Sequence, residues 1–259
     1  MSVLNEILKQ IDDNKEFPAY QAERRLDIFI NYFLADILKI CPENSGKQNK
    51  IEFIAPEFPL KKEKGNQSTN IDYLCLKIVN RQISRLLFVE LKTDVSSFNI
   101  DQFEIYCEYL KEGSCERGFN GVCNIAISKG MPFIHRKKYY HLIKVLYNKR
   151  LAGPLAQSKL FQELDEILDH ESKASEDELQ IIKVRFSQKL KELVAHLKES
   201  CVDYPISLYY IGPKEIENLE GFDKNKATLI PFEDLSNKAT KAKHSGLIKT
   251  IVKSLNKEK

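Results

Sequence analysis

The stretch from Asn70 to Lys92 constrains the fold more than any other part of the chain. Residues 70–78 and 84–92 are both rich in aliphatic and aromatic side chains, and the polar residues 80–82 lie between them. This pattern predicts a β-hairpin. If the chain folds back at Arg81, position i pairs with position 162 − i, and Asp72 lies directly opposite Glu90.

Lys92 follows Glu90 by two residues, so we expect both side chains on one face of the hairpin, together with Asp72. The other side chains of that face are apolar: Leu74, Leu76, Ile78, Leu86 and Phe88. Two carboxylates at the end of an apolar face repel each other and lose hydration, and a divalent cation relieves both costs. The alternative is a hydrated sheet end at which Lys92 is an ion-pair partner of the acids.

The length and composition are those of an ordinary soluble globular protein. The 259 residues, 42% of them hydrophobic and 30% charged, can form one large domain or a domain with an insertion. No basic region followed by a long apolar run opens the chain, and no segment approaches the ~20 apolar residues of a membrane span. The six cysteines form no Cys-x-x-Cys pair and no zinc pattern. We therefore expect a cytoplasmic protein with no membrane partner.

The positive charge of the chain is concentrated at its C-terminal end. The net charge is +3, but residues 238–259 carry seven lysines and one glutamate, so the remainder has a net charge of about −3. This tail is either a solvated terminus or a segment that attracts phosphate.

Hydrophobic periodicity predicts the remaining elements. Residues 18–40 read as a helix, and residues 51–60 as a strand that two prolines push toward a sheet edge or a bulge. A helix is expected from Asn99, which can cap it with Gln102 at the third helical position. Its expected buried stripe is Ile100, Phe103, Tyr106, Cys107 and Leu110, with Gly113 at its end. Further helices are expected at 135–148, 157–169 and 176–200, and strands at 206–211 and 228–232; residues 121–128 fit a short strand or a helical turn.

This order of elements predicts an α/β fold with a mixed central sheet flanked by helices. We expect one domain over residues 1–237. Its core comprises residues 18–112 and 204–232, with a helical insertion at 113–203, and the basic tail at 238–259 follows.

A helix, a strand, a strand with Asp72, a strand that ends in Glu90-Leu91-Lys92, and a helix with Gln102 follow one another. This arrangement resembles the PD-(D/E)xK nuclease superfamily, with its restriction-endonuclease-like fold, over residues 20–112 and more loosely over 206–212. Ile71 stands where many members have proline. Glu23 matches a glutamate that many members carry early in the first helix.

The resemblance implies a metal-dependent phosphodiesterase. Asp72 and Glu90 would bind Mg or Mn, with the Leu91 backbone carbonyl as a further ligand, and Lys92 would position water or stabilise developing charge. Gln102 would bind water or substrate, or serve only as part of the helix cap. Glu23 would be a ligand or a support for one, or an exposed glutamate favoured by the helix dipole.

Other residues are candidates for weaker reasons. Glu57 is a possible additional acid whose register against the hairpin is unknown. Basic side chains that could contact a phosphate backbone occur in two places, at Lys61 and Lys62 and at residues 136–138 (Arg136, Lys137 and Lys138), although solvated surface charge is the commoner reading. No Gly-rich phosphate loop and no serine or cysteine nucleophile motif is present in the sequence.

The sequence therefore predicts a nuclease, with DNA as the expected partner. The first alternative is a binding module on a nuclease-like fold that holds nucleic acid or protein without cutting. The second is an assembly subunit built around the 176–200 helix. Oligomeric state, base specificity and the choice between endo and exo cleavage do not follow from the sequence.

Overall fold

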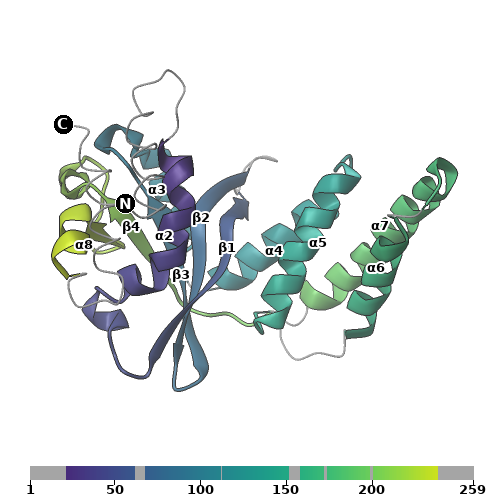
Figure 1. Ribbon diagram of the computed structural model, residues 1–259, viewed down its shortest axis with the longest axis horizontal. Helices are drawn as coiled ribbons and strands as arrows, with labels where there is room; N and C mark the ends of the chain where they lie inside the picture. The colour runs from purple at the N-terminus through teal and green to yellow at the C-terminus, as the bar shows by residue number, and fades with distance from the viewer. Residues whose placement is uncertain are drawn as a thin grey trace, which may run out of the picture. The chain divides into compact units, whose positions relative to one another are not determined.

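The computed structural model describes residues 22–61, 68–111, 113–151, 158–171, 174–198 and 201–238. These residues divide into two compact units (Figure 1). The first comprises the described residues up to Phe58, Ile71–Leu110 and those from Pro205 onward. The second comprises those of Pro59–Asn70 and Lys111–Tyr204.

A five-stranded mixed sheet organises the first unit, as the sequence predicted. Its strands are β1 (Asn49–Lys61), β2 (Ser68–Val79), β3 (Gln82–Leu91), β4 (Ile206–Gly212) and β5 (Ala227–Pro231), and their spatial order follows the sequence. β2 and β3 pair antiparallel, whereas β3 with β4 and β4 with β5 pair parallel. β1 lies at one edge, which suits its two prolines.

The hairpin of β2 and β3 turns at Asn80 and Arg81, whose φ angles are 52° and 68°. Two successive positive φ angles define the turn that matches the twist of a two-residue hairpin. The predicted pairing, with residue numbers that sum to 162, is correct from Tyr73 opposite Val89 to Lys77 opposite Arg85. It is wrong nearer the turn, because a bulge follows Lys77 and shifts the register by one residue.

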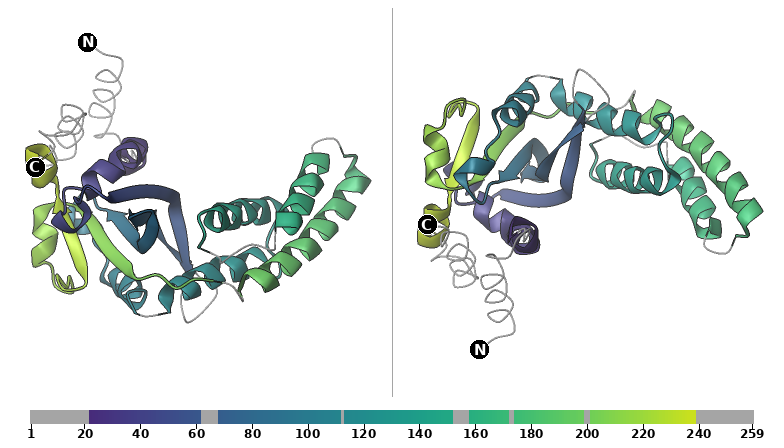
Figure 2. Two further views of the ribbon diagram at one scale, coloured as in Figure 1. Left: turned by 90° about the horizontal axis from the view of Figure 1, so that it is seen from below. Right: turned by 90° about the horizontal axis from the view of Figure 1, so that it is seen from above.

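Helices cover both faces of the sheet (Figure 2). The helices α2 (Ala22–Leu38) and α8 (Phe232–Lys238) pack on one face, where they share a core with Tyr73, Val89 and Tyr209. Because side chains alternate along a strand, residues 72, 74, 88 and 90 point to the other face. There α3 (Ile100–Glu108) packs, and the Phe88 and Tyr109 ring centroids lie 6.2 Å apart just beyond its end.

Three short 3-10 helices complete the first unit. They are η1 (Pro42–Asn44), η2 (Val95–Ser97) and η3 (Lys214–Asn218). η2 bridges the end of β3 and the start of α3, and the Asp94 carboxylate caps it by accepting a hydrogen bond from the Ser97 amide at 2.8 Å. This cap fixes the path of the chain between the predicted Glu90-Leu91-Lys92 motif and Gln102.

The second unit contains the helices α4 (Ser114–Ala126), α5 (Phe133–Asn148), α6 (Ser158–Glu171) and α7 (Glu176–Lys198). α7 packs on α4 and on α6, and its buried side chains are Phe186, Leu190, Leu193, Val194 and Leu197. The Glu178 side chain accepts a hydrogen bond from the Ser175 amide at 2.7 Å, as in a capping box at the start of α7.

Two local predictions are wrong, and one open alternative is decided. α3 ends at Glu108, and Gly113 caps the start of α4 instead of ending α3. Residues 121–126 belong to α4, so the choice between strand and helix is settled as helix. Ile100 is 43% exposed because it lies in the first turn of α3, where it contacts Gly221.

No helix of the described residues is long and apolar enough to cross a membrane.

Candidate functional site

The hairpin brings Asp72 and Glu90 together where the main-chain pairing of β2 with β3 ends. The last paired residues are Tyr73 and Val89, so Asp72 lies opposite Glu90. Each carboxylate contacts the main chain of the other strand: Glu90 Oε2 accepts from the Asp72 amide at 3.4 Å, and Asp72 Oδ2 from the Leu91 amide at 2.7 Å. Side chains thus continue the hydrogen bonding of the strands beyond the last main-chain pair.

Asp72, Glu90 and Lys92 are the charged members of a cluster of polar side chains at this end of the hairpin. Glu90 is the most deeply buried of them, with 2% of its surface exposed. Lys92 Nζ lies 2.8 Å from its Oε1 atom, and the Tyr106 hydroxyl donates to its Oε2 atom at 2.9 Å. An apolar environment makes an unpaired carboxylate very costly, which explains why donors surround Glu90. Part of the alternative interpretation is therefore correct: Lys92 is an ion-pair partner, but the pair is buried rather than hydrated.

β4 holds Lys92 in place. The Lys92 amide donates to the Ile211 carbonyl at 2.9 Å, which continues the parallel pairing of β3 with β4. Gly212 follows on β4, and a Cβ atom there would lie 2.9 Å from the Lys92 carbonyl oxygen and 3.3 Å from its Cβ. Only glycine allows this approach without a shift of the backbone.

α3 contributes the remaining polar groups. Asn99 caps the helix as predicted, because its side chain accepts from the Gln102 amide at 2.9 Å. The Gln102 side chain is separately engaged in the cluster: Oε1 accepts from Lys92 Nζ at 3.3 Å, and Nε2 donates to the Tyr106 hydroxyl. The Gln102 amide thus takes part in the helix cap, whereas the Gln102 side chain is hydrogen-bonded to Lys92 and Tyr106.

Aromatic rings surround the base of the cluster. Four of them pack on one another, with centroids 5.3 to 6.0 Å apart: Phe98, Phe103, Tyr210 and Phe222. Tyr210 lies beside Glu90 in the parallel pairing of β3 with β4. Burial raises the pKa of Glu90 even though Lys92, Tyr106 and the Asp72 amide lower it. Burial and the Glu90 charge both raise the pKa of Tyr106 and Tyr210, so both phenols stay protonated.

Sequence reasoning missed the roles of Tyr106 and Gly212. Tyr106 was assigned only to the buried stripe of α3, although its spacing of four residues from Gln102 places the two on one helix face. Gly212 ends an otherwise apolar strand, and such a glycine is a sign of close backbone approach. Neither signal predicts the contact that is formed, because tertiary packing brings Glu90 to Tyr106 and Lys92 to Gly212.

The donors of the cluster are of the type that Mg²⁺ or Mn²⁺ prefers. Asp72 and Glu90 supply carboxylate oxygens on one face, and a magnesium ion needs few protein ligands because it retains water. Among the described residues, no group of three or more His, Cys, Asp or Glu side chains is arranged to hold a metal. The two carboxylates alone suit such an ion chemically. Its remaining ligands would be main-chain oxygens, water or substrate.

Other predicted ligands are not shown beside the two acids. Glu23 lies on α2, whose described core residues pack on the opposite face of the sheet, and its side chain lies outside the described part. The Leu91 amide contacts Asp72, whereas a ligand role for its carbonyl stays a prediction. Glu57 is exposed and has a φ of 45°, an irregularity in β1.

The predicted phosphate-binding residues differ in their surroundings. Lys61 is exposed beside Gly121 of α4, and Lys62 lies outside the described residues. In α5, Arg136 donates to the Ser128 carbonyl at 3.1 Å and Lys137 binds Glu171 at 2.7 Å, whereas Lys138 is exposed. Two of these three cations therefore have partners inside the helical unit, so the patch is less available than the sequence suggested.

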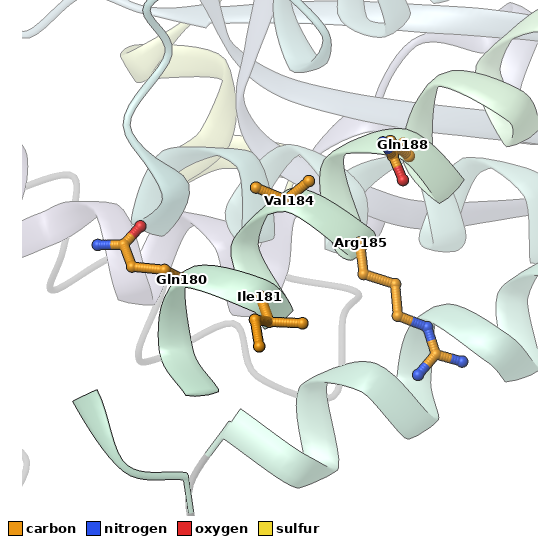
Figure 3. A pocket seen from close by; sticks show the side chains of 5 residues that line it. All are labelled: Gln180, Ile181, Val184, Arg185 and Gln188. Carbon is orange, nitrogen blue, oxygen red and sulfur yellow. The ribbon is translucent and has the colours of Figure 1, made fainter. Parts of the chain in front are cut away.

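A shallow hollow on α7 contains none of these residues (Figure 3). Five side chains of that one helix line it: Gln180, Ile181, Val184, Arg185 and Gln188. Ile181 and Val184 are 68% and 57% exposed. The hollow lacks convergent acids, so we do not regard it as a catalytic site.

Comparison of the chain with family models, with curated proteins and with solved structures finds no match. The geometry of the cluster is therefore the basis for a functional assignment.

Proposed function

We propose that the chain is a metal-dependent phosphodiesterase with a restriction-endonuclease-like core that cleaves nucleic acid, with DNA as the expected substrate. The observation that carries the proposal is the convergence of four polar side chains on one sheet face: Asp72, Glu90, Lys92 and Gln102. Two acids can hold a metal ion, and an ammonium group and a carboxamide can orient water or stabilise negative charge. They lie at strand ends, beside a helix, in an otherwise apolar environment.

Asp72 and Glu90 would hold the cation, which when bound would activate a water and neutralise charge on the phosphoryl oxygens. Lys92 Nζ, which contacts Glu90 and Gln102, would orient water or stabilise the negative charge of the transition state. Tyr106 fixes the Glu90 carboxylate by donating to it. The burial of Glu90 and of the neighbouring Tyr210 makes the surroundings less polar than water, which strengthens these interactions.

Cleavage assays with three variants test this proposal. The chain is incubated with supercoiled, linear and single-stranded DNA in Mg²⁺ or Mn²⁺, and the Asp72→Ala, Glu90→Ala and Lys92→Ala variants are compared with it. We expect a loss of at least about 100-fold for each, and loss of cleavage in a chelator. Glu104→Gln and Lys50→Ala, at exposed positions outside the cluster, serve as matched controls. Full activity in all three cluster variants would contradict the proposal.

One observation favours the alternative of a binding module that does not cut. Lys92 already neutralises Glu90, and both Glu90 oxygens have donors, so the described cluster is satisfied without a cation. This alternative predicts salt-sensitive binding of DNA with no hydrolysis in any divalent metal. Binding measured by fluorescence anisotropy beside the cleavage assay separates the two functions.

A further inference from the structure

Two cysteines lie next to each other where the chain enters and leaves the helical unit. Cys115 is in the first turn of α4, and Cys201 follows the end of α7 at Lys198. Asp203 joins the two segments, because its carboxylate accepts from the Gly113 amide at 2.7 Å and from the Cys115 amide at 3.1 Å. The segment around Cys201 is thereby fastened to the start of α4.

The two thiols are hydrogen-bonded to each other. The Cys201 thiol also lies 3.4 Å from the Leu151 carbonyl, and the Val202 amide donates to the same oxygen at 3.4 Å. Cys115 is 5% exposed, whereas Cys201 is partly exposed. All six cysteines are free thiols, and this pair is in direct contact.

Their environments give the two thiols different reactivity. The hydrogen bond from Cys201, with one from the Tyr204 main chain, lowers the pKa of Cys115 in spite of its burial. The same hydrogen bond and burial raise the pKa of Cys201. Cys115 is thus the better source of thiolate, and Cys201 is a protonated neighbour in contact with it.

We propose that Cys115 and Cys201 form a redox-reactive dithiol that hydrogen peroxide converts into an intramolecular disulfide. The Cys115 thiolate attacks one peroxide oxygen, the O–O bond breaks, and the leaving hydroxide takes up a proton to become water. Cys201 then attacks the sulfur of the Cys115 sulfenic acid, loses its proton and releases a second water. Overall, two thiols are oxidised and one peroxide is reduced to two waters.

The resulting link would join the two ends of the helical unit. It would close a loop over residues 116–200, and a crosslink across a long loop restricts the unfolded chain strongly. We expect the oxidised protein to melt at a temperature at least about 5 °C higher than the reduced protein. This inference does not depend on the proposed nuclease activity.

Peroxide treatment of the full chain tests the proposal. The reduced protein is incubated with a small excess of hydrogen peroxide, alkylated, and examined by intact mass and by peptide mapping without reductant. We expect loss of two hydrogens, a Cys115–Cys201 crosslinked peptide, and recovery of both thiols with dithiothreitol. A folded protein in which these two thiols stay reduced, or in which another pair is linked, would overturn the proposal.

Single variants separate the two roles. Cys201→Ser should trap the sulfenic acid of Cys115, which dimedone labels, whereas Cys115→Ser should give neither the label nor the disulfide. Cys123→Ala is the matched control: Cys123 is buried in the same helix, and burial raises its pKa to about 12, so the crosslink should form unchanged. Circular dichroism establishes that each variant is folded, and dimedone labelling of folded Cys115→Ser at Cys201 would refute the assigned roles.

Discussion

Burial of the Glu90 carboxylate destabilises the fold, yet the proposed chemistry requires this carboxylate. Its carboxylate is almost fully buried, which costs free energy, and three donors offset part of that cost: Lys92, Tyr106 and the Asp72 amide. Burial still prevails, since the pKa of Glu90 is raised. Replacing a buried ion pair by apolar side chains of similar volume is often neutral or stabilising, so stability alone does not account for the charge of Glu90.

The Tyr106→Phe substitution tests this balance without metal. With its folded pKa raised, Glu90 contributes stability that is complete below its unfolded pKa of about 4.3 and is lost as pH rises through the folded pKa. Removing the Tyr106 donor raises the folded pKa further, because that hydrogen bond favours the charged form. We expect the variant to lose about 1.5–3 kcal/mol at pH 7, and less near pH 4.5.

Urea unfolding at several pH values in a chelator measures this effect. Tyr139→Phe, a change of the same size in α5, is the control and should show no such pH dependence. A loss of stability in Tyr106→Phe that is the same at pH 4.5 and pH 7 would show that Glu90 does not depend on this hydroxyl.

The hairpin turn is the first element whose backbone can be tested. Asn80 tolerates a positive φ, whereas Arg81 with a φ of 68° does so at a cost of about 1–2 kcal/mol. Glycine removes that cost, but its greater freedom in the unfolded chain destabilises the folded state by about 0.5–1 kcal/mol. The net effect of Arg81→Gly should be a stabilisation of about 0.5–1 kcal/mol. Thermal unfolding measures the gain, and Arg81→Ala, which keeps a Cβ atom, should give none.

The contact of β4 with β3 at Gly212 is the second testable element. In Gly212→Ala the added Cβ meets the Lys92 carbonyl, so β4 or Lys92 has to move, at a cost of about 1–3 kcal/mol. We expect weaker cleavage together with the lower stability, because the movement displaces Lys92 from Glu90. Gly46→Ala is the matched control, because the atoms nearest to its added Cβ belong to the Asn49 side chain rather than to the backbone. An unaltered melting temperature in Gly212→Ala would contradict the close approach.

The elements also show how far the sequence alone determines the structure. Alternation and turn residues predicted the β2–β3 hairpin and placed Asp72 beside Glu90, because both are local properties of one hairpin. The bulge after Lys77 was not predicted, since nothing in the local pattern distinguishes a one-residue shift close to the turn. The stripe of α3 was wrong at Ile100 and right at Phe103 and Tyr106, because the first turn of a helix can face a neighbouring loop instead of the core.

At the scale of the whole molecule, the sequence shows where positive charge is concentrated but not which cations are free to bind a partner. The concentration of lysines at the C-terminal end is visible in the sequence, whereas the occupation of Arg136 and Lys137 by Ser128 and Glu171 depends on the packing of the helical unit. Those two cations are engaged and so offer little to a phosphate backbone. The tail, most of which lies outside the described residues, is therefore the larger reserve of positive charge for the proposed partner.

Deletion of residues 239–259 tests that role of the tail. It removes six lysines and one glutamate, a net charge of +5. For a protein that neutralises phosphates, the logarithm of the binding constant falls linearly with log[salt], with a slope of about −0.9 per contact. Loss of six lysines should therefore flatten the slope by up to about 5. We expect the largest loss of affinity at 50 mM salt and a much smaller loss at 200 mM, measured by fluorescence anisotropy with labelled duplex DNA in a chelator.

A variant with the six lysines changed to glutamine keeps the chain length and should behave like the deletion, because charge rather than length governs the effect. Cleavage at saturating DNA should be unchanged in both, because both variants retain Asp72, Glu90, Lys92 and Gln102, the side chains proposed to act in cleavage. If the salt slope is the same with and without the tail, the lysines form only a solvated terminus. The phosphate contacts then have to come from exposed cations of the folded units, such as Lys61 and Lys138 of the second unit.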